Sequence, residues 1–152
     1  MSNSPPLKEY ERVLIKKVHP NAKVPAGATT GSAGFDLVAV TKEYDPSRDQ
    51  ITYDVGLAFE LPKGWAGLLF PRSSIKNYDL TLVNGVGLLD SDYRGSVKLV
   101  FNCHKIPNRR LYNVGDRIGQ LVAIKMTEFV FANAANLSKT TRGEGGFGST
   151  GE

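Results

Sequence analysis

Apolar and polar residues alternate in several short segments of the chain, a pattern typical of strands with one buried face. Every second residue is apolar within residues 51–55 and again within 97–103, where Val100 is the one apolar residue on the polar face. Residues 12–18 and 117–131 are also rich in β-forming side chains. The pattern predicts a protein built from short strands.

Turn signals separate these segments, and no stretch of the chain keeps a helical period for three turns. The signals are Pro25-Ala26-Gly27, Asp45-Pro46-Ser47, Pro62-Lys63-Gly64 and Asn113-Val114-Gly115-Asp116. Their spacing predicts an all-β sandwich or barrel. One short helix is expected from Arg72 to Tyr78, with Ser73 or Ser74 as its N-terminal cap.

Length and composition are those of one soluble domain. The chain has 152 residues, 22% of them charged, and its net charge of +4 is scattered, so no stable nucleic-acid binding is expected. No apolar run reaches the ~18 residues of a membrane span, and residues 1–10 lack the apolar core of a signal peptide. We expect no membrane contact and a cytoplasmic or otherwise soluble intracellular protein, with a nuclear location also open. Residues 1–10 are expected to be disordered, 11–138 to form one β domain and 139–152 a mobile arm.

Cysteine and histidine offer little chemistry. Cys103 is the one cysteine, which excludes an intrachain disulfide, and it shares the alternating face of Leu99 and Phe101, so we expect a buried thiol. His19 and His104 are far apart and have no neighbour at ligand spacing, so no zinc site is expected.

The C-terminal segment is rich in glycine. Its glycines within residues 142–151 are Gly143, Gly145, Gly146, Gly148 and Gly151. Such a segment loses much entropy on ordering, which fits either a frayed terminus or an arm that orders on a ligand. Arg142 supplies a forked phosphate donor, Ser149 and Thr150 supply hydroxyls, and Phe147 supplies a flat face for a base. Composition alone leaves both interpretations open.

Three other places carry candidate chemistry. Asp90 and Asp92 lie in the turn-like end of residues 84–95, as active-site carboxylates or as hydrogen-bonding turn aspartates. Asp36 lies inside an apolar run, so it needs an arginine, backbone amides or metal-bound water as a partner. Arg72 precedes two serines, which suits an anion, although a helix cap is the simpler alternative.

Five segments, in order, resemble the motifs of the homotrimeric dUTP diphosphatases. They are AGFDL (33–37), PRSS (71–74), GLLDSDYRG (87–95), GDRIGQLV (115–122) and RGEGGFGSTG (142–151). The resemblance implies a jelly-roll-like subunit and a homotrimer whose active sites are shared between chains. It also implies hydrolysis of dUTP to dUMP and pyrophosphate, which limits uracil in DNA and supplies dUMP for dTTP synthesis.

The same resemblance implies a role for each site residue. Asp90 would activate the water that attacks the α-phosphorus, Tyr93 would pack beneath the deoxyribose, and residues 84–87 would pair with uracil. Asp36 would hold water on Mg²⁺ that is itself bound mainly by the phosphates, and Arg142 would reach the γ-phosphate. The implied substrate-binding set is Arg72, Ser73, Ser74, Asn84, Gly87, Tyr93, Gln120, Arg142, Phe147, Gly148, Ser149 and Thr150.

Departures from the family pattern are small. Ser74 stands where many members have glycine, and Gly119 stands where alanine is usual and is expected to loosen its strand slightly. Two alternatives to a dUTP-hydrolysing enzyme remain open. One is a dCTP deaminase-related enzyme, which needs a glutamate-centred site, and the other is a non-catalytic nucleotide-sensing regulator on the same fold.

Overall fold

The structure is a computed structural model that describes residues 11–27 and 29–146. Within them the chain forms short strands and one 3-10 helix, η1 (Ser73–Asn77). The strands are β1 (Leu14–Lys17), β2 (Phe35–Val38), β3 (Thr41–Asp45), β4 (Gln50–Asp54), β5 (Leu57–Glu60), β6 (Trp65–Phe70), β7 (Leu80–Leu82), β8 (Gly87–Leu89), β9 (Lys98–Cys103) and β10 (Arg117–Lys125).

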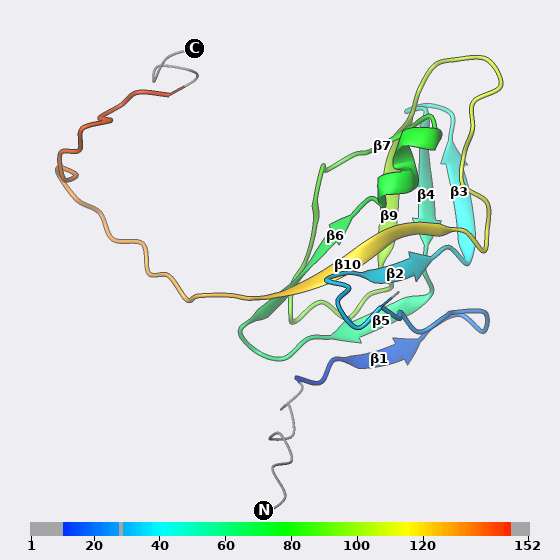
Figure 1. Ribbon diagram of the computed structural model, residues 1–152, viewed down its shortest axis with the longest axis horizontal. Coiled ribbons are helices and arrows are strands. Elements are labelled where there is room, and N and C mark those ends of the chain that lie inside the picture. The colour runs from blue at the N-terminus through cyan, green and yellow to red at the C-terminus, as the bar shows by residue number, and fades with distance from the viewer. Residues whose placement is uncertain (1–10, 28, 147–152) are drawn as a thin grey trace, which may run out of the picture.

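The strands make two four-stranded antiparallel sheets and one two-stranded sheet (Figure 1). The four-stranded sheets have the orders β2-β10-β6-β8 and β3-β4-β9-β7, and β1 pairs with β5. Consecutive strands often lie in different sheets, so the chain passes repeatedly from one layer to the other. This architecture confirms the all-β, jelly-roll-like prediction and the single short helix.

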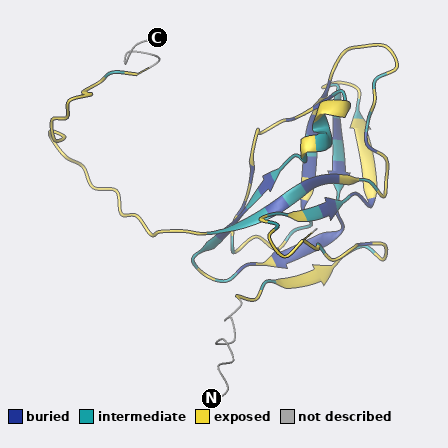
Figure 2. Ribbon diagram, in the orientation of Figure 1, coloured by how far each residue is buried: buried dark blue, intermediate teal, exposed yellow. Residues whose placement is uncertain are grey.

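The alternation predicted for the two central segments is present in β4 and β9. These strands pair in the register Ile51↔Phe101 and Tyr53↔Leu99, and all four side chains are buried. Tyr53 and Phe101 meet edge to face, with ring centroids 5.8 Å apart. The core therefore rests on the inward positions that the period of two identified (Figure 2).

The two other β-rich segments differ from expectation. Strand β1 is exposed at all four positions, and β10 ends at Lys125, short of the predicted residue 131. Phe129, Val130 and Phe131 have no strand partner in the described chain and are 74%, 95% and 97% exposed. Propensity favoured a strand here, but a strand also needs a neighbour, and the single chain supplies none.

Gly119 has a packing role that the sequence did not reveal. It lies beside a register shift in the β10–β2 ladder. A Cβ at this position would lie 2.5 Å from Leu99 Cδ2 and 2.9 Å from the Phe70 carbonyl oxygen. The glycine therefore allows β10 to pack closely against Leu99 and the Phe70 backbone.

Two local predictions were wrong. Helix η1 begins after Arg72, and no side chain caps it, so neither Ser73 nor Ser74 has the predicted role. The N-cap position falls on Arg72, and Ser74 Oγ instead accepts a long hydrogen bond of 3.4 Å from Arg72 Nη1. The signal at residues 25–27 marks no turn, because Gly27 forms a bridge to Phe35.

Within the described residues, no helix is long and apolar enough to cross a membrane. Cys103 is buried, at 6% exposure, as its alternating position predicted. Burial raises the pKa of its thiol.

Candidate active site

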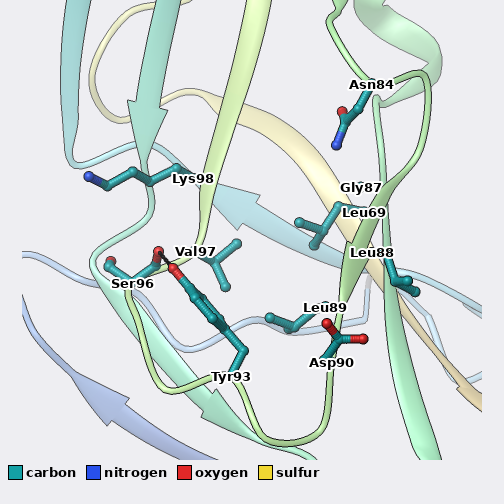
Figure 3. Close-up of a pocket in the computed structure, with 10 residues that line it drawn as sticks. All are labelled: Leu69, Asn84, Gly87, Leu88, Leu89, Asp90, Tyr93, Ser96, Val97 and Lys98. Atoms are coloured by element: carbon teal, nitrogen blue, oxygen red, sulfur yellow. Dashed lines mark hydrogen bonds between the residues drawn. The ribbon is translucent and has the colours of Figure 1, made fainter.

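A cavity of about 230 Å³ opens where the β7–β8 connection passes strand β9 (Figure 3). Asn84, Gly87, Asp90 and Tyr93 line it, so four residues predicted for the nucleoside side of the site lie together. Lys98 also lines it, with its side chain directed away from Asn84 and Asp90 (Figure 3).

The shape of this cavity follows from the connection between the sheets. Strand β7 pairs with β9 in one sheet, whereas β8 pairs with β6 in the other. The turn between them uses Gly85 at φ 66° in the left-handed region, which glycine tolerates best. A Cβ at Gly87 would lie 2.9 Å from Leu69 Cβ, so only glycine lets β8 approach β6 this closely.

Asp90 follows β8 directly and is exposed at the cavity wall. The loop then turns, with Tyr93 N–H donating to the Asp90 carbonyl at 3.2 Å. The Tyr93 hydroxyl donates a long bond of 3.4 Å to the Ser96 carbonyl (Figure 3). Gly95 makes this possible, because a Cβ there would collide with the Tyr93 hydroxyl. Asp92, the second carboxylate of the segment, does not line this cavity.

A second cleft, of about 320 Å³, collects the residues predicted for the phosphate side. Asp36 on β2 and Gln120 on β10 lie opposite each other in the ladder, and Arg72 and Ser73 follow β6. Gln120 Nε2 donates to the Pro71 carbonyl at 3.2 Å, which fixes its amide beside the start of η1.

Two arginines satisfy Asp36. Arg72 Nε donates to Oδ1 at 2.8 Å, and Arg117 Nη1 donates to Oδ2 at 3.0 Å. An arginine was one of the partners that its apolar surroundings required. Arg117 was not among the predicted site residues. Its contact with Asp36 follows from its position on β10, the strand that pairs with β2.

The described residues offer no cluster of three His, Cys, Asp or Glu side chains that would hold a metal ion. In the second cleft the carboxylate is that of Asp36, and each of its oxygens already accepts an arginine hydrogen bond. This donor set fits a metal bound mainly by a ligand's phosphates and touched by Asp36 through water. It does not fit a metal held directly by the protein.

The two clefts have no lining residue in common, so one chain does not bring the five motifs together. Arg142 lines neither cleft; its Nε donates to the Gly145 carbonyl at 3.0 Å. Residues 126–146 run away from the sheets (Figure 1). The remaining predicted contacts, Phe147, Gly148, Ser149 and Thr150, lie outside the described residues.

The fold is similar to solved dUTPases of staphylococcal phages. A variant dUTPase of Staphylococcus bacteriophage 80alpha, solved with dUpNHpp, matches with a TM-score of 0.78 at 24% identity, covering 93% of this chain and 99% of that one. A variant from phage phi11 of S. aureus, described with a coordinated structural Mg(II) ion, matches with a TM-score of 0.70 at 19% identity, covering 82% and 97%. At these identities the likeness establishes the fold.

Sequence comparison establishes the family as well as the fold. The deoxyuridine 5'-triphosphate nucleotidohydrolase of Helicobacter hepaticus is 37% identical over 144 residues, covering 94% of this chain and 90% of the relative. The protein of the same name from Thermobifida fusca is 37% identical over 142 residues, covering 92% and 79%. The dUTPase family model matches residues 20–151, so this chain belongs to the dUTPase family.

Proposed function

We propose that the protein is a dUTP diphosphatase, which hydrolyses dUTP to dUMP and pyrophosphate. The observation that carries this proposal is the division of the motif residues between two clefts. One holds an exposed carboxylate and a tyrosine beside a narrow strand connection, and the other holds arginine, serine and glutamine donors. These are the two environments that a nucleoside and a chain of phosphates require.

The first cavity would take the nucleoside. The backbone of residues 84–87 would pair with uracil, and the Tyr93 ring would pack against the deoxyribose. Asp90 would orient a water molecule and accept its proton as the water oxygen attacks the α-phosphorus. The bond to the bridging oxygen then breaks and pyrophosphate leaves. An exposed carboxylate can act as the base when its geometry is right.

The second cleft would take the phosphates. Ser73, Arg72 and Gln120 line it and carry hydrogen-bond donors, and stabilising charge is the main demand of phosphoryl transfer. Magnesium bound to the substrate would neutralise further charge when present. Asp36 would contact that ion through water, while Arg72 and Arg117 hold its carboxylate in place.

We propose a homotrimer in which the first cavity of one chain faces the second cleft of another. The outer face of the β2-β10-β6-β8 sheet supports an association of this kind. Leu88, Leu68 and Val122 stand side by side across three strands of that sheet, and Leu88 is 62% exposed. The apolar residues 129–131 are also uncovered. Apolar residues left uncovered in this way favour protein–protein contact.

The arm would complete the site. Residues 126–146 extend from the body, so Arg142 can reach a cleft on a neighbouring chain (Figure 1). In this arrangement Arg142 contacts the γ-phosphate, Phe147 covers the base, and Gly148, Ser149 and Thr150 add phosphate donors. Ordering of the glycine-rich arm would then be coupled to substrate binding.

The activity is tested by incubating the protein with dUTP and with dCTP in separate reactions. We expect pyrophosphate from dUTP and no ammonia from dCTP. Ammonia from dCTP without pyrophosphate from dUTP would replace the proposal with a deaminase. Asp90→Asn should lower kcat by orders of magnitude while retaining nucleotide binding. Asp92→Asn is the matched control two residues away and should keep its activity.

Sharing of sites between chains is tested by mixing two inactive variants. Asp90→Asn chains keep their arms, and chains lacking residues 142–152 keep Asp90. If sites are shared, reassembled mixtures regain turnover that neither variant has alone. If each site lies within one chain, the mixtures stay inactive. A mass measurement in solution should give three chains for the wild type and for both variants.

A further inference from the structure

The loop that carries Asp90 and Tyr93 is fastened at its end to the turn between β4 and β5. Ser96 Oγ donates a short hydrogen bond of 2.5 Å to Asp54 Oδ1. Backbone bonds continue the attachment at Val97, whose N–H donates to the Leu57 carbonyl at 2.9 Å. The loop therefore rests on a strand turn that lies outside the five motifs.

Asp54 is held firmly enough to act as an anchor. Its Oδ1 also accepts the Gly56 N–H at 2.7 Å, and its side chain is 22% exposed. Gly56 has φ 66°, and a Cβ there would lie 2.6 Å from His19 Cβ. The Gly56 carbonyl in turn accepts the Val18 N–H at 2.9 Å. The turn has little freedom to move.

Ser96 carries the constraint from Asp54 to Tyr93. Its hydroxyl bonds to Asp54, and its carbonyl accepts the Tyr93 hydroxyl at 3.4 Å (Figure 3). The missing side chain of Gly95 leaves the room that the hydroxyl occupies. The position of the tyrosine ring therefore depends on where Ser96 is held.

Among residues 11–27 and 29–146, the loop has one other side-chain attachment to the body, and it is weaker. Arg94 Nε lies 3.7 Å from Glu60 Oε2, and both side chains are about half exposed. Exposed ion pairs of this kind contribute little to stability, because water screens them. The bond between Ser96 and Asp54 is partly buried, so it is the better shielded of the two side-chain attachments.

We propose that Asp54 is a positioning residue that sets the preference for deoxyribose over ribose. This inference rests on the proposed function, in which the Tyr93 ring closes the space beneath the sugar. A 2′-hydroxyl adds one oxygen atom, so a ring displaced by a fraction of an ångström would admit it. Without its anchor the loop gains that freedom, and UTP becomes a better substrate relative to dUTP.

The test compares variants at both ends of the bond. Ser96→Ala removes the bond and leaves Asp54 to Gly56, so it is the main variant; Asp54→Ala is the second. Ser96→Thr keeps a hydroxyl and should rescue the phenotype. Asp54→Asn keeps the accepting oxygen but removes the charge that faces Lys98 Nζ at 3.8 Å, so it separates the hydrogen bond from the ion pair.

Asp45 provides the control. Its Oδ1 accepts hydrogen bonds from Ser47 N–H at 2.8 Å and from Ser47 Oγ at 2.6 Å. Asp54 Oδ1 likewise accepts one backbone N–H and one serine hydroxyl. The turn that holds Asp45, however, lines neither cleft. Asp45→Ala therefore reproduces the loss of a turn aspartate without touching the loop.

The ratio of kcat/KM for dUTP to that for UTP is the primary measurement. We expect it to fall about tenfold in Ser96→Ala and Asp54→Ala, mainly through a raised KM for dUTP, and to stay at the wild-type value in Asp45→Ala, Asp54→Asn and Ser96→Thr. An unchanged ratio in Ser96→Ala overturns the proposal, even if both activities fall together.

Calorimetry of dUMP and UMP binding measures the same preference for deoxyribose over ribose without turnover. If the wild type releases no pyrophosphate from dUTP, the proposed function fails, while the ratio of the two dissociation constants still tests the role of Asp54. We expect Ser96→Ala to bring the ratio of the two dissociation constants closer to one. A ratio equal to that of the wild type would mean that Asp54 stabilises its turn and has no part in the preference for deoxyribose.

Discussion

Arg72 Nε lies 2.8 Å from Asp36 Oδ1, and this pair joins two segments 36 residues apart in the sequence into one cleft. Their side chains are 26% and 20% exposed, so the pair is partly screened from water. Arg117 takes the other carboxylate oxygen with a side chain that is 55% exposed. The two ion pairs therefore differ in how far water screens them, and the Arg72 pair is the less exposed.

Replacing Asp36 with alanine should destabilise the fold by about 1–3 kcal/mol, because it leaves a partly buried guanidinium without its carboxylate. Arg117→Gln should cost less than about 1 kcal/mol, because it breaks the more exposed of the two pairs. Urea unfolding measures both. Equal losses would mean that exposure does not decide the strength of these contacts.

Two buried tyrosines should respond oppositely to loss of their hydroxyls. Tyr53 Oη donates to the Tyr112 carbonyl at 2.9 Å, whereas Tyr112 Oη is buried near Ser74 and makes no hydrogen bond of ordinary geometry within the part of the chain that the structure describes. Tyr53→Phe leaves a buried carbonyl unsatisfied and should cost about 1–2 kcal/mol. Tyr112→Phe removes an unpaired hydroxyl and should be neutral or stabilising. Thermal unfolding of the two variants checks the contrast, which a larger loss in Tyr112→Phe would contradict.

Gly119→Ala should destabilise the protein, although alanine is usual there in the family. The added Cβ would press on the Phe70 carbonyl oxygen, and backbone yields less readily than a side chain. Overpacking of this kind costs about 1–3 kcal/mol. Gly31→Ala is the control, since nothing lies within 4 Å of its Cβ. Equal stability of the two variants would show that β10 adjusts freely.

The stability of the fold should fall at acid pH through Asp49. The Tyr44 hydroxyl, at 2.7 Å, and then Arg109 lower the pKa of this carboxyl. Its contribution is complete above the unfolded pKa near 4 and is lost as pH falls through the lower folded value. Asp49→Asn is a fitting substitution, since Asp49 has φ 52° and asparagine tolerates that region.

The melting temperature of Asp49→Asn should therefore lie below that of the wild type at pH 7, with the difference shrinking below pH 4. Measuring both proteins across this range cancels the titration of the other carboxyl groups. A difference that does not change with pH would exclude the role of the Asp49 charge.

The sequence predicted those parts of the fold that depend on local pattern. Strands β4 and β9 followed from the period of two, because one face of each is buried by the opposite sheet. The fate of residues 129–131 did not follow, because propensity does not specify a neighbouring strand. The caps proposed at Ser73 and Ser74 failed because the helix begins at Ser73, so its N-cap position falls on Arg72, whose side chain pairs with Asp36.

The candidate site was predicted residue by residue, but its division was not. Motif order along the chain carries no information about which strand ends face one cleft, so the separation of Asp36 from Asp90 appeared only in three dimensions. Asp54 looked like the polar member of an alternating strand. Its bond to Ser96, 42 residues away, depends on the pairing of β4 with β9, which no local pattern encodes.

The burial of Cys103 has a practical consequence. Because it is the one cysteine of the chain and lies in the core with a raised pKa, the folded protein should be almost inert to thiol reagents. A cysteine introduced among residues 139–146 would then be the single reactive thiol. Spectroscopic labels can therefore be attached to the arm alone, in an otherwise unaltered enzyme, and its movement followed as nucleotide is added.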